Sequence, residues 1–343
     1  MFNAERCLAA VLAALLLLVG CGRPRTEEKE PVQTPAESAE PSLEPVPLLE
    51  GPIYLLSEPE KPLWPGWAAV SVENSEDARP QSGLTQADLV VEAPAEGTFT
   101  RFTAYYRSQP VDVIGPVRSA RQYTMAQVRA YGAPFAHAGG SMEALAMARS
   151  DSAIMNLDEI YGGIEWGFWR SSDRVAPHNL YTSTERIDRM MKAVGYTPQP
   201  VPTTPKVKGL LPEGQFVTRV DVDWGGPNQI AWVWNEEAGA YQRFIQDEPH
   251  TVVEADGVFV PNLVFMEVEG TYSGPEDGWY MDLSLGGPAT VVVAGYMWEG
   301  RWELVEGEGF RLFPAEGSTV PPFQPGQVWA HLITYTSNFS VVR

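Results

Sequence analysis

Strand-like patterns dominate the second half of the sequence and limit the folds that it can adopt. Several segments there alternate apolar with polar residues, or concentrate the β-branched and aromatic residues that favour strands. These segments are residues 216–222, 230–235, 240–246, 258–269, 289–305 and 328–334. Residues 235–239 and 298–302 have the composition of hairpin turns. We therefore predict a mostly antiparallel β domain over residues 215–343.

The first half mixes strand and helix patterns. Strand patterns occur at residues 67–74, 88–92, 100–106 and 135–138, and helical spacing occurs at residues 120–131, 142–149 and 184–194. Ser141 stands in the N-cap position of the second helix, and Ser183 or Thr184 in that of the third. This mixture predicts an α/β-type domain over residues 63–197, and an α+β class for the whole chain. A Pro-rich segment, residues 198–214, is expected to link the two domains.

The N-terminus has the pattern of a secretory signal. Arg6 precedes an apolar run, residues 8–19, which is too short to cross a bilayer core of about 30 Å. The run ends in Leu18-Val19-Gly20-Cys21, which looks like a lipobox, the motif at which bacterial lipoproteins are cut before a lipid-modified Cys. We predict a signal peptide over residues 1–20 and a diacylglyceryl group on Cys21, which would anchor the protein to the membrane. The alternative is an ordinary signal or transmembrane segment with an incidental Cys.

Composition limits the partners of the chain. Residues 21–62 are rich in Pro, Glu and Ser, so we predict a disordered acidic tether. The 343 residues carry 24 Lys+Arg against 44 Asp+Glu, a formal net charge of −20, which argues against nucleic acid as a partner. The two Cys are Cys7 and Cys21, so a processed and acylated chain would have no free thiol for a disulfide, a nucleophile or a metal.

Five short strings in the first half combine Gly, Pro, Arg and His. They are residues 78–84, 96–101, 115–121, 137–141 and 176–183. With GPVRSAR, HAGGS and PHNLYTS in that order, the sequence resembles the YerB-like lipoprotein family of Gram-positive bacteria, from about Trp64 to the end. The resemblance implies an exported, lipid-anchored protein with a domain of unknown function and a C-terminal companion domain. Thr98 stands where the family usually has Gly, and residues 74–76 replace an Asn-His-Pro-like turn, so these loops are expected to differ in shape.

Arginines gather in these strings although the chain is acidic. The guanidinium fork matches carboxylate or phosphate, which predicts a pocket for an anionic ligand. The alternative is that these arginines form structural ion pairs with Asp88, Glu92, Glu96 and Asp173. The candidate ligand-binding residues are Arg101, Arg118, Ser119, Arg121, His137, Gly139, Gly140, Ser141, Arg174, His178 and Asn179, with Arg170 nearby. Arg118, Arg121, His137, Ser141, His178 and Asn179 are predicted to line one concave surface.

Two functions fit these residues. The first is a lipid-anchored binding or scaffold protein of the cell envelope, which holds an anionic cell-wall component or an envelope protein. The alternative is an envelope hydrolase or transferase that uses His137, His178 and Ser141, which requires these side chains to lie within hydrogen-bond reach. Ser141 lacks the Gly-x-Ser-x-Gly context of a nucleophile elbow, and helix capping alone explains it. Two His and Glu143 do not define a zinc site, so neither a metal nor a cofactor is predicted.

Overall fold

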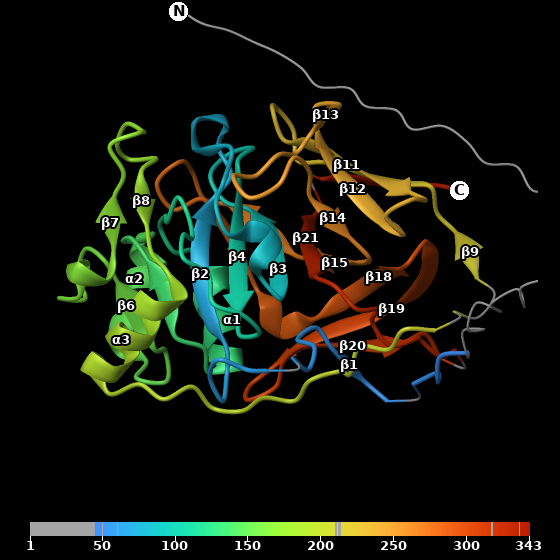
Figure 1. Cartoon of the computed structure of the whole chain (residues 1–343), viewed down its shortest axis with the longest axis horizontal. Helices are drawn as coiled ribbons and strands as arrows, with labels where there is room; N and C mark the ends of the chain where they lie inside the picture. The colour runs from blue at the N-terminus through green and yellow to red at the C-terminus, as the bar shows by residue number, and fades with distance from the viewer. Residues whose placement is uncertain are drawn as a thin grey trace, which may run out of the picture. The chain divides into compact units, whose positions relative to one another are not determined.

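A large mixed β-sheet forms the centre of the structure, a computed structural model (Figure 1). The structure describes residues 45–49, 51–59, 61–209, 211, 214–316, 318–335 and 337–343. Within these residues the sheet has twelve strands in the order β1-β20-β19-β18-β15-β21-β3-β4-β2-β5-β6, with β9 paired to β19. Its strands are β1 (Ile53–Tyr54), β2 (Ala68–Glu73), β3 (Leu89–Pro94), β4 (Thr100–Tyr106), β5 (Phe135–His137), β6 (Asn156–Asp158), β9 (Gln215–Phe216), β15 (Asn262–Val268), β18 (Gly287–Val293), β19 (Tyr296–Val305), β20 (Gly309–Pro314) and β21 (Val328–Thr334).

The two halves of the sequence share this sheet. Strand β21 lies between β15 and β3 and is parallel to both, so Val328 is in register with Leu89 on one side and with Asn262 on the other. The segment 198–214 therefore does not separate two independent sheets. Residues Leu43–Arg343 form one compact unit. The predicted signal peptide and Cys21, and the predicted tether up to residue 44, lie outside the described residues.

A six-stranded antiparallel sheet packs on one face of the large sheet. Its order is β13-β12-β11-β10-β22, with β14 paired to β12. Its strands are β10 (Arg219–Asp223), β11 (Gln229–Asn235), β12 (Ala240–Ile245), β13 (Glu248–Pro249), β14 (Phe259–Val260) and β22 (Asn338–Val342). Two further pairs stand apart from both sheets: β7 (Trp169–Arg170) with β8 (Leu180–Tyr181), and β16 (Gly270–Tyr272) with β17 (Trp279–Met281).

Three α-helices occur in the described chain, and all were predicted from sequence. Helix α1 is Gln122–Tyr131, α2 is Met142–Ser150 and α3 is Thr184–Val194; α2 and α3 lie near β6, in green in Figure 1. The hydroxyl oxygens of Ser141 and Ser183 accept hydrogen bonds from the first turns of α2 and α3, which confirms both N-caps. The described chain is mostly β-strand with three α-helices, which agrees with the α+β class at this coarse level. No helix in the described ranges has the length and hydropathy needed to cross a membrane.

The hairpin turn predicted at residues 298–302 is wrong. Strand β19 runs straight through these residues, and Gly300 pairs with Ala289 on β18 and Pro314 on β20. The chain reverses earlier, at Ala294 and Gly295, which have φ angles of 44° and 93°. A Gly with no Cβ tolerates such positive φ values, so the turn forms there. The turn predicted at residues 235–239 is confirmed between β11 and β12.

Alternation along the central strands builds two hydrophobic cores, one on each face of the large sheet. Every residue of β2, β3, β4 and β21 is buried, as expected for strands covered on both faces. One core lies against the six-stranded sheet and includes Val70, Val90, Phe102, Trp232, Tyr241 and Trp329. The other lies against α1 and includes Ala69, Val91, Tyr105, Tyr123, Val128 and Ala330.

Candidate functional site

The polar strings of the first half meet beside β2. Residues 115–121 run along this strand, where the backbone N–H of Arg118 donates to Ser71 O at 3.0 Å. On the other side, the N–H of Ala138 donates to Arg118 O at 3.0 Å, which joins residues 137–141 to the same segment. Three X-Pro peptide bonds in these strings are cis: Arg79-Pro80, Gly115-Pro116 and Ala176-Pro177.

Glu73, at the end of β2, holds two candidate residues at the surface. Its carboxylate is nearly buried, with Oε1 3.1 Å from Arg118 Nε and Oε2 3.0 Å from His178 Nδ1. The side chains of Arg118 and His178 keep 26% and 22% of their surface exposed. These contacts use one nitrogen of each side chain. Among the described residues the Nη atoms of Arg118 have no hydrogen-bond or ion-pair partner, so they are available to a ligand, whereas His178 Nε2 lies 3.9 Å from Asp77 Oδ2.

Arg170 adds a second guanidinium beside this pair. Its Nη1 donates to Asn179 Oδ1 at 3.1 Å, and its Nη2 lies 3.6 Å from Glu159 Oε1. Burial lowers the pKa of Arg118, Glu73 raises it, and the positive charges of Arg101 and Arg170 lower it again. An anion that contacts both Arg118 and Arg170 would offset the unfavourable effect of their like charges.

Arg101 and Arg121 form buried ion pairs instead. Both side chains are about 95% buried, and both guanidinium groups contact the carboxylate of Glu96. Arg101 Nη1 also donates to the carbonyl oxygen of Ser119 at 2.9 Å. Burial lowers the pKa of both arginines. For these two residues, the geometry matches the structural ion-pair alternative.

His137 and Ser141 also have structural partners. His137 is fully buried, with Nδ1 2.8 Å from Gly139 O and Nε2 2.5 Å from Asn156 Oδ1. Ser141 Oγ accepts from the N–H of Ala144 as the cap of α2. The tight turn of Gly139 and Gly140 brings this loop against Ala120, and the N–H of Gly139 donates to Asp158.

The structure thus divides the candidate residues into two groups. Arg118 and His178 lie at the surface with Arg170, whose Nη1 donates to the buried Asn179, and Arg174 lies near them with its guanidinium donating to Pro80 O and Asp77 O. Arg101, Arg121, His137 and Ser141 are buried. Among the described residues, no hydrogen bond joins any two of His137, Ser141 and His178. The same ranges contain no group of three or more His, Cys, Asp or Glu placed to hold a metal ion.

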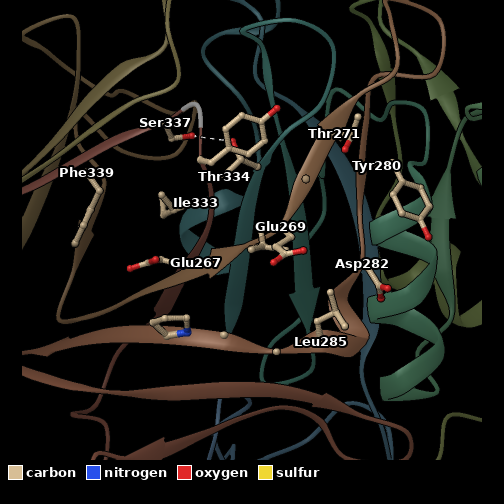
Figure 2. A pocket seen from close by; sticks show the side chains of 16 residues that line it. Glu267, Glu269, Thr271, Tyr280, Asp282, Leu285, Ile333, Thr334, Ser337 and Phe339 are labelled. Atoms are coloured by element: carbon tan, nitrogen blue, oxygen red, sulfur yellow. Dashed lines mark hydrogen bonds between the residues drawn. The ribbon is translucent and has the colours of Figure 1, made fainter.

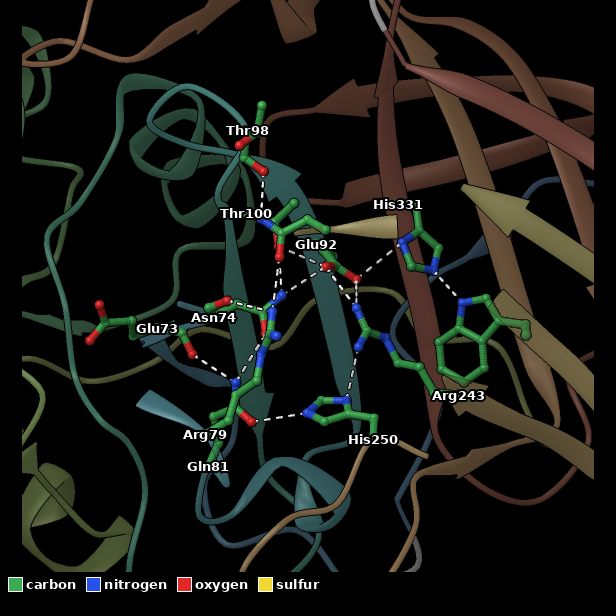
Figure 3. Close-up of polar contacts among 12 residues, drawn as sticks. Glu73, Asn74, Arg79, Gln81, Glu92, Thr98, Thr100, Arg243, His250 and His331 are labelled. Carbon is green, nitrogen blue, oxygen red and sulfur yellow. Dashed lines mark hydrogen bonds and ion pairs between the residues drawn. The ribbon is translucent and has the colours of Figure 1, made fainter. Parts of the chain in front are cut away.

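A buried polar network that the sequence analysis missed connects the two sheets (Figure 3). Arg243 of β12 pairs with Glu92 of β3, with Nη2 2.9 and 2.8 Å from the two carboxylate oxygens. Arg243 Nη1 lies 2.9 Å from His250 Nδ1, and His250 Nε2 lies 2.9 Å from Gln81 Oε1. The aromatic rings of Phe102, Trp232 and Trp329 surround the guanidinium at 5.4–5.9 Å.

Further polar residues extend the network to the loops. Asn74 Nδ2 donates to Glu92 Oε1 at 3.1 Å, and Arg79 reaches both Asn74 Oδ1 and Asn228 Oδ1. Desolvation and the charge of Arg243 lower the pKa of Arg79 to about 10, against the opposing effect of Glu92 and Glu76. On the other side, Trp232 Nε1 donates to His331 Nε2 at 3.0 Å. The sequence does hold a signal for this network. Arg243 alternates with Tyr241 and Ile245 and so shares their inward face, where a charged residue needs a buried partner.

The fold and these contacts define an α+β protein in which two chain regions share one sheet and are joined by a buried Glu–Arg pair. The chain belongs to the family described as "Protein of unknown function (DUF3048)": residues 57–197 match its N-terminal domain and residues 220–330 its C-terminal domain. The resemblance drawn from the sequence motifs is therefore confirmed.

One curated relative and one solved structure support this assignment. The relative is named "Putative lipoprotein YerB" of Bacillus subtilis; it is 30% identical over 334 residues, which is 95% of this chain and 94% of that protein. The crystal structure of the YerB protein from Bacillus subtilis matches with a TM-score of 0.68 and 28% identity, covering 85% of this chain and 99% of that one.

Proposed function

We propose that this protein is a lipid-anchored protein of the cell envelope that binds an anionic ligand or partner through Arg118, Arg170 and His178. One observation carries the proposal: the nearly buried Glu73 holds Arg118 and His178 at the surface, beside the half-exposed Arg170. Guanidinium groups bind carboxylate and phosphate with two parallel hydrogen bonds, and they keep their charge when partly buried.

The surroundings of this surface favour a large partner. Ile160 lies against Gly139, Val175 accepts from the backbone N–H of His178, and Met142 follows Ser141. Large apolar side chains exposed on these segments are Met142, Ile160, Tyr161 and Val175, which are 55–82% exposed. Exposed apolar groups beside charged ones are common at protein-protein contacts. An envelope protein or a cell-wall polymer with anionic groups would use both kinds of contact.

The anchor is the second part of the proposal. The relative in Bacillus subtilis carries the word lipoprotein in its name, and residues 18–21 of this chain have the lipobox pattern. Cys21→Ser should release the protein from the membrane fraction or leave an uncleaved precursor, because the lipid would have no attachment point. A Cys7→Ser variant is the matched control and should remain anchored. A Cys21→Ser protein of mature size in the membrane would contradict the anchor.

Binding is tested by isothermal titration calorimetry of the whole chain with inorganic diphosphate and with a hexaglutamate peptide. Arg118→Ala and Arg170→Ala should each weaken binding at least tenfold. Arg311→Ala is the matched control, since Arg311 has the same 26% exposure and also pairs with glutamates. Absence of binding to either probe, or equal affinity in all three variants, would overturn the binding site.

The alternative function, an envelope hydrolase or transferase, has less support. The Ser141 hydroxyl already caps α2, and both nitrogens of His137 face structural partners inside the protein. His178 Nδ1 lies 3.0 Å from Glu73 Oε2. The three side chains therefore share no hydrogen bond through which one could activate another.

A further inference from the structure

We propose that a second site, an acidic cleft at the end of β15, binds an extended basic peptide segment of a partner protein (Figure 2). The cleft has a volume of about 950 Å³, which lies at the upper end of the range for ligand pockets. It opens where β15 leaves the large sheet and continues into β16. The β16–β17 pair and residues 282, 285–288, 333–335, 337 and 339 form its walls.

The charge of this cleft is unbalanced. Glu267, Glu269 and Asp282 line it, and no Lys or Arg is among its lining residues. Within the described chain, the carboxylates of Glu267 and Glu269 form neither an ion pair nor a hydrogen bond, and both residues are exposed. Figure 2 shows Glu269 and Asp282 around the same opening, with Glu267 on the side of Phe339. Lys or Arg side chains entering the cleft would relieve the repulsion among these carboxylates.

Exposed aromatic and apolar groups line the same cleft. Tyr280, Leu285 and Tyr335 are 42%, 59% and 76% exposed. Tyrosine rings attract ammonium and guanidinium groups through their faces, and Leu285 offers an apolar contact to an aliphatic side chain. A small inorganic cation would use only the carboxylates. A basic peptide with apolar residues between its charges would use all three kinds of group.

An open strand edge in the cleft favours an extended backbone as the occupant. Strand β16 pairs only with β17 among the described strands, and Gly270 and Thr271 of β16 line the cleft. The outer edge of β17 is occupied, because the N–H of Trp279 donates to Ala95 O and that of Met281 to Gln122 Oε1. The outer edge of β16 is thus the one to which an extended peptide can add as a strand.

The test is fluorescence anisotropy of a labelled, capped Lys-Leu-Lys-Leu-Lys peptide with the whole chain at low salt and at 0.15 M salt. Glu267→Gln combined with Glu269→Gln should weaken binding at least tenfold, because both unpaired charges are removed while the side-chain size is kept. Glu236→Gln combined with Glu237→Gln is the matched control, since these exposed residues lie in the β11–β12 turn and the change removes the same charge. Arg118→Ala should leave this binding unchanged, which separates the cleft from the proposed anion site.

Two further probes distinguish a peptide from a simple cation. Spermidine should bind at least tenfold more weakly than the peptide. A peptide N-methylated at alternate backbone nitrogens keeps its charge but loses donors for strand addition, so its affinity should also fall at least tenfold. The proposal would be overturned if the natural chain bound spermidine or the N-methylated peptide as tightly as the unmodified peptide. It would also be overturned if the glutamine double variant bound the peptide as tightly as the natural chain, or if the peptide did not bind.

Discussion

Arg243 Nη2 lies 2.9 and 2.8 Å from the two carboxylate oxygens of Glu92, although the two residues are 151 positions apart in the sequence. Neither side chain is exposed to solvent. Glu92 comes from the large sheet and Arg243 from the six-stranded sheet that packs on it, so the pair fixes how the two sheets meet. Because both charges are buried, each depends on the other for stabilisation.

Removing either partner of this pair should therefore destabilise the protein strongly. Arg243→Met should lower the free energy of unfolding by about 3–5 kcal/mol, because it leaves the Glu92 carboxylate buried without its counter-charge. Urea denaturation followed by tryptophan fluorescence measures the change. The control is Arg219→Met, which breaks a pair with Asp221 that is 34–40% exposed and should cost less than about 1 kcal/mol. Similar losses in both variants would contradict a special role for the buried pair.

The two buried histidines of this network should make stability depend on pH. Burial, and after it the charge of Arg243, lowers the pKa of His250 and of His331 well below the ordinary value of 6.5, and Arg79 lowers that of His250 further. Below pH 6.5 the unfolded chain therefore binds protons that the folded chain does not, and the free energy of unfolding falls as the pH falls. The slope approaches about 1.4 kcal/mol per pH unit for each histidine.

The measurement is urea denaturation at several values between pH 7.5 and pH 5. Carboxylates also titrate in the lower part of this range, so the comparison is between the natural chain and His331→Gln. The variant should show a pH dependence that is weaker by about 1.4 kcal/mol per unit below pH 6.5, whatever its stability at pH 7.5. An unchanged slope would mean that His331 is protonated equally in both states.

Glu96 should matter more for stability than either arginine that it contacts. Its carboxylate lies against both Arg101 and Arg121, so Glu96→Gln would leave two buried guanidinium groups without their carboxylate. Arg121→Ala would leave Arg101 still paired with Glu96. We expect Glu96→Gln to lower the melting temperature more than Arg121→Ala does, as measured by differential scanning calorimetry. Arg121→Ala should also leave hexaglutamate binding unchanged, since the Arg121 guanidinium is not at the surface. If this variant lost hexaglutamate binding at an unchanged melting temperature, Arg121 would belong to the ligand site after all.

Local elements could be predicted from this sequence because their causes are local. Ser141 and Ser183 mark helix starts through a cap that depends on the next three residues, and the alternation in residues 100–106 defines β4 directly. The sequence analysis placed the turn between β18 and β19 too late, because Gly295 and Gly300 are both glycines and either could occupy a turn. Strand pairing decides between them, since Gly300 has partners on both sides.

Long-range pairings could not be predicted in the same way. The parallel pairing of β21 with β3 joins residues more than 200 positions apart, and no local pattern specifies it. For the same reason the partner of Glu92 was sought among nearby arginines, whereas the structure supplies Arg243 from the other sheet. The surface residues around Glu73 were found because Gly and Pro turns carry them, but turns alone do not show that Arg121 points inward and Arg118 outward.

The cap of α2 offers a direct test of the structural role of Ser141. Ser141 Oγ accepts from the N–H of Ala144 at 3.3 Å, so Ser141→Ala should lower the free energy of unfolding by about 1 kcal/mol. Ser141→Asp supplies another capping oxygen and a negative charge near the helix N-terminus, so it should recover most of this loss. Urea denaturation of the three proteins gives the comparison. Rescue of stability by Ser141→Asp would support the capping role of Ser141. A failure of both variants to alter stability would remove the capping explanation.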